Sequence, residues 1–130
     1  MTREALKNAA VSMLERAYAP YSHFPVGAAL ECEDGTVFTG CNVENAAYPA
    51  GICAERNAMF HAVAEGHTKF RRIVIAGKSH DFCVPCGMCR QVMRDFSKDL
   101  EILCLNDAGD EAVFSLEQLL PHGFGPEHLN

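Results

Sequence analysis

The first part of the chain has apolar residues at the spacing of an amphipathic helix, which we expect over residues 3–18. The positions that carry this pattern are Leu6, Ala9, Ala10, Met13, Leu14 and Ala17. Pro20 is expected to end the helix because proline lacks a backbone N–H and blocks the preceding turn. The residues from Pro20 to Pro25 then indicate a rigid surface loop.

From residue 26 the apolar positions follow a period of two, which is typical of β-strands. Two such stretches flank Asp34 and Gly35, a pair that predicts a hairpin with a two-residue turn. Along the return strand the alternation places Asn42 and Glu44 on one face and Val43 on the other. Two polar side chains are therefore expected next to each other at the end of this strand.

The second half of the chain alternates between helical and strand patterns. We expect a helix over residues 53–65, with Gly66 at its C-terminal cap, and a further helix after Pro85. Short β-branched or apolar runs predict three strands, at residues 72–77, 101–106 and 111–114.

Ser115 and Gln118 have the spacing of a capping box, which predicts a short last helix that Pro121 ends. The complete order is α-β-β-α-β-α-β-β-α. It predicts a single α/β domain over residues 1–130, built as a three-layer α/β/α sandwich with a mixed sheet of about five strands. Ligand sites in such sheets lie beyond the carboxyl ends of parallel strands, where we expect the second and third helices to begin.

Composition and charge indicate which classes of molecule this chain is expected not to bind. Apolar residues make up 48% and charged residues 22%, an ordinary balance for a globular protein. The net charge of −6 disfavours nucleic acids and anionic membranes as partners. The longest apolar runs have four residues, whereas a membrane span needs about 20. The first residues mix charges, so we also expect no secretory signal.

Three of the seven cysteines stand at the expected starts of the second and third helices. An odd cysteine count without a secretory signal indicates a reduced, cytoplasmic protein whose thiols pack, bind metal or react. Cys86 and Cys89 are three positions apart, so both sulfurs face one side of a helical turn. Cys53 adds a third soft ligand, and three thiolates leave one tetrahedral position of zinc open, as in catalytic zinc sites.

Glu55 and Arg56 follow Cys53 closely in the chain. If Cys53 occupies the first turn or the cap of its helix, Glu55 can turn toward the open metal position without ligating the metal. Zinc lowers the pKa of a bound water to about 7, and a nearby carboxylate can take and return its proton. Arg56 is expected to donate hydrogen bonds to the thiolates and offset their negative charge.

Cys53, Glu55 and the Pro-Cys-x-x-Cys run at residues 85–89 match the signature of zinc deaminases, in which Cys is permitted at the histidine position. Further motifs are YAPYSHFPVGAAL at 18–30, GCNVENAAY at 40–48, CAER at 53–56 and PCGMCRQ at 85–91. With these motifs the chain resembles the cytidine deaminase family, in its short homotetrameric form, over nearly its whole length. The resemblance implies hydrolysis of cytidine and 2′-deoxycytidine to uridine and 2′-deoxyuridine plus ammonia, as in pyrimidine salvage. It also implies one zinc ion per subunit, held by Cys53, Cys86 and Cys89, with Glu55 as the proton shuttle.

The same resemblance implies the contacts to the nucleoside. Asn42 and Glu44 correspond to residues that bind the ribose 3′-hydroxyl, in agreement with their predicted place on one strand face. Phe24 corresponds to an aromatic residue that packs on the pyrimidine, and the backbone of Ala54 to a group that reads the base. The positions that the family uses in a neighbouring subunit's pocket are Ala46, Tyr48 and Phe124.

Three other functions stay open at this point. One is a deaminase of the same fold that acts on a nucleoside antibiotic, a nucleotide or a tRNA adenosine. A second is a non-catalytic zinc module in which Cys83 supplies a fourth thiol. A third is a thiol–disulfide oxidoreductase that uses Cys86 and Cys89. Cys32 and Cys41 lie on predicted inward faces and are expected to be small core residues.

Overall fold

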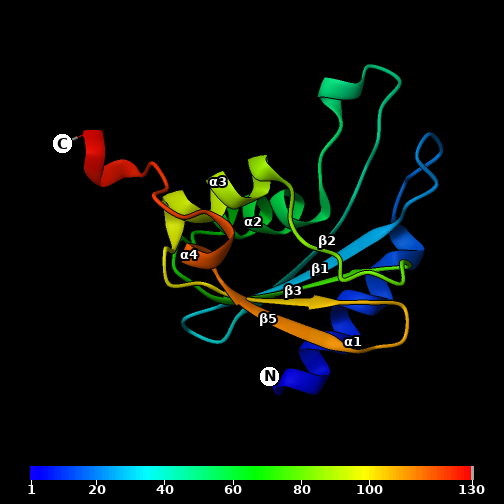
Figure 1. Ribbon diagram of the computed structural model, residues 1–130, viewed down its shortest axis with the longest axis horizontal. Helices are drawn as coiled ribbons and strands as arrows, with labels where there is room; N and C mark the ends of the chain where they lie inside the picture. The colour runs from blue at the N-terminus through cyan, green and yellow to red at the C-terminus, as the bar shows by residue number, and fades with distance from the viewer. Residues whose placement is uncertain (130) are drawn as a thin grey trace.

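Five strands form one mixed sheet in the computed structural model, which describes residues 1–129 (Figure 1). Their spatial order is β2-β1-β3-β4-β5. The strands are β1 Val26–Cys32, β2 Val37–Cys41, β3 Phe70–Gly77, β4 Glu101–Leu105 and β5 Glu111–Ser115. Both the strand number and the mixed character of the sheet confirm the sequence prediction.

Helices cover both faces of this sheet, which confirms the predicted three layers (Figure 1). The α-helices are α1 Arg3–Ser12, α2 Ala54–Ala64, α3 Gly87–Phe96 and α4 Leu116–Leu119. On one face Leu6 and Ala10 of α1 pack on the sheet, and on the other Met59 of α2 and Met93 of α3 do so. Within residues 1–129 no helix combines the length and the apolar character that a bilayer span requires.

Short 3-10 helices complete the order of elements: η1 Met13–Arg16, η2 Tyr48–Ala50 and η3 Pro126–Leu129. The predicted first helix over 3–18 is therefore an α-helix to Ser12 followed by η1. Gly66 follows α2 with a φ of 91°, the left-handed conformation expected of a C-terminal cap. Ser115 forms the predicted capping box with Gln118 at the start of α4.

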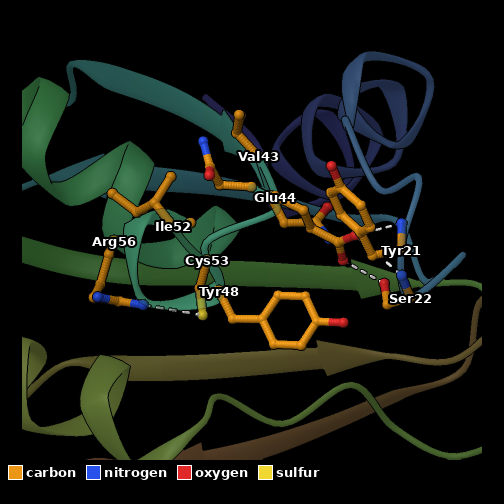
Figure 2. A pocket seen from close by; sticks show the side chains of 11 residues that line it. Tyr21, Ser22, Val43, Glu44, Tyr48, Ile52, Cys53 and Arg56 are labelled. Carbon is orange, nitrogen blue, oxygen red and sulfur yellow. Dashed lines mark hydrogen bonds between the residues drawn. The ribbon is translucent and has the colours of Figure 1, made fainter.

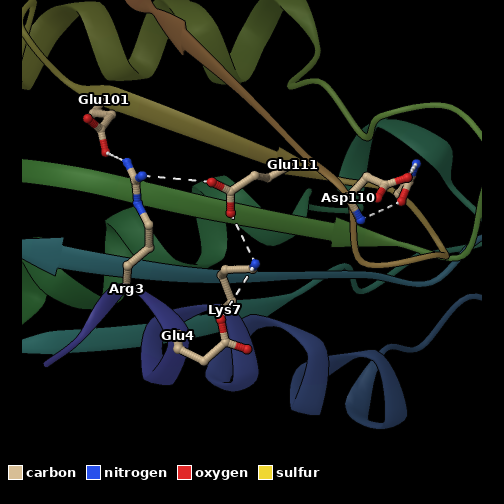
Figure 3. Close-up of polar contacts among 7 residues, drawn as sticks. Arg3, Glu4, Lys7, Glu101, Asp110 and Glu111 are labelled. Carbon is tan, nitrogen blue, oxygen red and sulfur yellow. Dashed lines mark hydrogen bonds and ion pairs between the residues drawn. The ribbon is translucent and has the colours of Figure 1, made fainter.

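Ion pairs at one edge of the sheet attach α1 to β4 and β5 (Figure 3). Arg3 donates to Glu101 at 2.8 Å and lies 3.7 Å from Glu111, and Lys7 lies 3.0 Å from Glu111. Exposed pairs of this kind contribute about 0–1 kcal/mol each. These ion pairs therefore orient α1, whereas the burial of its apolar side chains supplies most of the free energy that holds it on the sheet.

The predicted two-residue turn of the first hairpin is wrong. β1 and β2 pair with Glu31 opposite Val37, and the Cys32 N–H donates to the Thr36 carbonyl, so residues 33–35 form a three-residue loop. The Gly35 N–H donates to the Cys32 carbonyl, and Gly35 has a φ of 91°. A turn followed by one residue in the left-handed conformation matches the right-handed twist of the two strands, as a two-residue turn also does. Glycine adopts this conformation without a steric penalty.

The strand directions bring the starts of two helices to one edge of the sheet. β1 is antiparallel to both β2 and β3, so β2 and β3 run in the same direction, and β3 is parallel to β4. α2 follows β2 and α3 follows β3, as the sequence predicted. Between β2 and α2 the chain makes a projecting arm that carries η2 (Figure 1), and its base is closed by reciprocal hydrogen bonds between Val43 and Ile52.

Gly40 sets how closely β2 approaches the first turns of α2. A Cβ atom at this position would lie 2.4 Å from the Ala54 carbonyl oxygen and 2.6 Å from the Ala58 nitrogen. Both are backbone atoms, so a side chain could be accommodated only by moving the helix away from the sheet.

We predict that Gly40→Ala lowers the free energy of unfolding by about 2–3 kcal/mol, because it overpacks this contact. Gly87→Ala is the control, because nothing lies within 4 Å of a Cβ atom there, and a change below about 0.5 kcal/mol is expected. Urea unfolding of both variants under the same conditions measures the difference. Equal stabilities would contradict the steric explanation.

Candidate functional site

Three cysteine thiols meet at the edge of the sheet where α2 and α3 begin. Cys53 is the N-cap of α2, Cys86 is the N-cap of α3, and Cys89 lies buried in the first turn of α3. The Sγ atoms of Cys53 and Cys86 are 3.7 Å apart, and those of Cys86 and Cys89 are 3.6 Å apart. All three sulfurs lie within 4.8 Å of one another. The predicted cap position of Cys53 and the predicted convergence of the three thiols are both confirmed.

The spacing of these sulfurs fits zinc. A tetrahedral zinc with Zn–S bonds of about 2.3 Å separates its sulfur ligands by about 3.8 Å. Cys83, the fourth thiol considered from the sequence, is not a member of the cluster. Burial raises the pKa of the Cys83 thiol to about 12, which keeps it protonated. The described residues therefore offer three thiols to a metal, as an open site requires. Cys32 and Cys41 are buried core residues, as expected.

Hydrogen bonds favour the thiolate form of Cys53. The pKa of Cys53 is lowered to about 5, chiefly by a hydrogen bond from the Cys89 thiol and also by the Arg56 guanidinium. Arg56 Nη2 donates to Cys53 Sγ at 3.4 Å, the contact predicted from the sequence (Figure 2). The Cys89 thiol keeps its proton in this pair because the hydrogen bond to Cys53 and burial both raise its pKa.

Glu55 lies in the first turn of α2 and is only 4% exposed. Burial raises the pKa of its carboxyl group to about 7, and the negative charge of the Cys53 thiolate acts in the same direction. A carboxyl group with such a pKa can both accept and donate a proton at neutral pH. Glu55 is thus placed beside the thiols in the state that a proton shuttle requires.

A cavity of about 470 Å³ opens next to Cys53 and Arg56 (Figure 2). Its walls come from residues 21–22, from residues 42–45, which follow β2, and from the 51–53 segment of the returning arm, together with Tyr48 and Arg56. Asn42 and Glu44 both line it, and so does Val43. The predicted strand alternation that sets Val43 on the other face is therefore wrong, because β2 ends at Cys41 and the chain leaves the sheet to form the arm. The cavity therefore extends from the side chains of Asn42 and Glu44 to Cys53 of the thiol cluster.

The loop before β1 supplies the hydrogen-bond partners of Glu44 and Asn42. The backbone N–H groups of Tyr21 and Ser22 each donate to Glu44 Oε1 at 3.0 Å, and the Ser22 hydroxyl donates to Glu44 Oε2. Asn42 accepts from the Val26 N–H at 2.8 Å and donates to the Phe24 carbonyl at 2.9 Å. Sequence reasoning missed Tyr21 and Ser22, since the motif around Pro20 indicates a loop but not what the loop contacts.

The remaining predicted site residues lie in different surroundings. Phe24 is 40% exposed and Ala54 is buried, and the side chains of both lie outside the cavity wall. Tyr48 lines the cavity of its own chain, with its ring centroid 6.2 Å from that of Tyr21. Ala46 and Phe124 are exposed away from the cavity, and Phe124 stacks on His128.

Comparison with known proteins identifies the family. The model of the cytidine and deoxycytidylate deaminase zinc-binding region matches residues 1–104, which include all three clustered thiols. The chain belongs to this deaminase family. The fit of the cluster to zinc and the nature of the matched region agree, so Cys53, Cys86 and Cys89 are the zinc-binding group of this deaminase.

Individual relatives of this deaminase cover nearly its whole length. A cytidine deaminase of Sporosarcina psychrophila is 44% identical over 117 residues, which are 89% of this chain and 86% of that protein. One of Halalkalibacterium halodurans is 40% identical over 131 residues, covering 100% and 99%. The crystal structure of a cytidine deaminase from Burkholderia pseudomallei is 50% identical, with a TM-score of 0.91 over 95% of this chain and 100% of that chain.

We predict that Arg56→Gln weakens zinc binding by about tenfold, because the thiolates of this deaminase lose their neighbouring cation. Loss of a hydrogen bond that lowers the pKa of Cys53 raises that pKa, so protons displace the metal at higher pH. The acid limb of the pH–rate profile should therefore move upward. A chelator titration across pH measures the metal affinity directly.

Arg71→Gln serves as the control, since Arg71 is exposed at the opposite end of β3 and donates to the Glu33 carbonyl. It should leave zinc affinity unchanged. An Arg56→Gln variant with the affinity and pH profile of the unmodified protein would rule out the charge-offsetting role.

Proposed function

We propose that this chain catalyses the hydrolytic deamination of cytidine and 2′-deoxycytidine to uridine and 2′-deoxyuridine, with release of ammonia. The observation that carries the proposal is a three-thiol zinc group beside the buried Glu55, with Cys53 of that group lining a nucleoside-sized cavity. Proteins named cytidine deaminase that match this chain over most of its length support the choice of substrate.

Glu55 is the catalytic residue of the proposed reaction. When bound, zinc supplies a Lewis acid that lowers the pKa of water from about 16 to about 7. Water adds at C4 of the pyrimidine, and Glu55 carries one of its protons to N3. Glu55 then carries the second proton, from the new C4 hydroxyl, to the 4-amino group; the C4–N bond breaks, ammonia leaves and C4 becomes a carbonyl. Its pKa of about 7 supports both transfers, because neither the protonated nor the ionised carboxyl is strongly favoured at neutral pH.

Asn42 and Glu44 retain the capacity to bind one sugar hydroxyl. The Glu44 carboxylate has about four acceptor sites, of which the loop fills two on Oε1 and one on Oε2. Asn42 uses its oxygen and one N–H, so a second N–H remains. One acceptor and one donor match the needs of a hydroxyl group, and this supports the 3′-hydroxyl of the ribose as their ligand.

The base contacts are further parts of the proposal. We assign Phe24 as the aromatic group against the pyrimidine and the Ala54 backbone as the group that reads the base.

Arg56 is the one cation among the described residues that lines the cavity, and it donates a hydrogen bond to Cys53. A phosphate on the 5′ carbon would lack a charged partner there, so a nucleoside is favoured over a nucleotide.

We also propose a homotetramer with shared active sites, working in the cytoplasm. Tyr48 is 76% exposed on the projecting arm and Phe124 is 55% exposed near the C-terminus, which suits aromatic side chains that reach a neighbouring subunit. Ala46 lies on the same arm. The cytoplasmic assignment rests on seven cysteines that are all free thiols.

The direct test is the loss of absorbance when the purified protein is incubated with cytidine. We expect turnover with zinc present, loss of turnover after removal of the metal by a chelator, and recovery when zinc is returned. A metal-free preparation with full activity would overturn the proposal, and so would a zinc-loaded one that leaves cytidine unchanged.

We predict that Glu55→Gln keeps zinc but loses at least about 4 kcal/mol of transition-state stabilisation, near a thousandfold in rate. Glutamine preserves the shape of the side chain but cannot carry the proton. Glu65→Gln at the other end of α2 is the matched control and should retain its activity, because Glu65 is exposed. Zinc content and the rate on cytidine are measured together, and near-normal turnover by the Glu55 variant would remove its assignment.

A further inference from the structure

Ser22 joins the two halves of the polar wall of the cavity. Its hydroxyl donates to Glu44 Oε2, and its N–H donates to Glu44 Oε1 at 3.0 Å (Figure 2). Its hydroxyl oxygen also accepts from the Phe24 N–H at 3.0 Å. It therefore contacts both the residue proposed to bind the sugar and the backbone of the residue proposed to meet the base. It is also exposed and lines the cavity, so a role in packing the core does not explain its contacts.

The loop around Ser22 is held in a conformation that it would not adopt by itself. His23 has a φ of 57°, in the left-handed region that non-glycine residues seldom occupy. The His23 N–H donates to the Ala19 carbonyl, and the hydrogen bonds to Glu44 and Asn42 fix the residues on both sides. Contacts across the cavity wall therefore maintain the loop.

The orientation of the Glu44 carboxylate depends on these contacts. The two backbone donors both reach Oε1, whereas the Ser22 hydroxyl is the group that engages Oε2. Without it, Oε2 has no partner from the loop, and rotation about the last side-chain bond is restrained from one side only. The position of the remaining acceptor site then varies, and a sugar hydroxyl meets a less ordered partner.

We infer that Ser22 is a positioning residue for sugar recognition: its hydroxyl fixes the Glu44 carboxylate so that one acceptor site stays available to the nucleoside hydroxyl. This inference rests on the proposed function. The effect of Ser22 is confined to the interaction between Glu44 and that hydroxyl.

The test compares two substrates in the full-length, zinc-loaded protein. With cytidine, Ser22→Ala should lower kcat/KM by about tenfold, the size expected for a lost hydrogen bond to a charged group. With 3′-deoxycytidine, which lacks the hydroxyl proposed to meet Glu44, the same variant should change kcat/KM by less than about twofold. A general disturbance of the loop would instead lower both values equally, and that result would overturn the inference.

Two further variants keep the test decisive if Ser22→Ala disturbs folding. Ser22→Thr retains the hydroxyl at an exposed position and should restore the discrimination between cytidine and 3′-deoxycytidine. In a Glu44→Gln background, the addition of Ser22→Ala should cost less than about twofold more, because the two side chains act as one unit. Independent, multiplying losses would contradict the inference.

Ser12→Ala is the matched control, since the Ser12 hydroxyl donates to the Ala9 carbonyl at the end of α1, away from the cavity. It should leave both rates unchanged. Failure of the inference is distinguishable from failure of the proposed function. If the unmodified protein does not act on cytidine, the proposed function falls, whereas normal turnover with an unaffected Ser22→Ala variant removes only the role of Ser22.

Discussion

The site depends on keeping negative charge on sulfur at a partly buried edge of the sheet. Burial alone keeps a thiol protonated, as it does at Cys83. Cys53 escapes this because the Cys89 thiol and the Arg56 guanidinium donate hydrogen bonds to its sulfur, which lower its pKa to about 5. Arg56 adds a full positive charge 3.4 Å from Cys53. Convergence of the three thiols beside Arg56, at the starts of α2 and α3, therefore distinguishes the metal-binding cysteines from Cys83.

The same environment at the edge of the sheet raises the pKa of Glu55, whereas the pKa of Cys53 is lowered there. Removal from water raises the pKa of its carboxyl group, and the neighbouring thiolate raises it further. The Cys53 thiolate thus lies beside a carboxyl group whose pKa is raised to about 7. Groups whose pKa values are pushed in opposite directions by one environment are characteristic of acid–base catalysis. The short distance in sequence between Cys53 and Glu55 ensures that both groups share this environment.

The arm between β2 and α2 links the thiol group to the cavity wall that Asn42 and Glu44 form. Its base is closed by the hydrogen bonds between Val43 and Ile52, directly before Cys53. Asn42 and Glu44 stand on the outgoing side of that base, and the loop before β1 attaches to both of them. The distance from the thiol group to the polar wall is therefore set by one short paired segment. A change in the arm would move the polar wall of the cavity relative to the thiol group.

The sequence by itself determined the element order, the α/β class and the candidate zinc ligands, because periodicity, helix caps and cysteine spacing are local patterns. Cys53 and Glu55 were recognisable for the same reason, being two positions apart at a helix start. Only the tertiary structure decided the contacts between Ser22 and Glu44, which depend on how a loop lies against an arm 22 residues further along the chain. It also decided the hairpin turn, where the strand register at Gly35 selected three loop residues over two. Such pairings depend on the relative placement of whole segments, a property that no single stretch of residues contains.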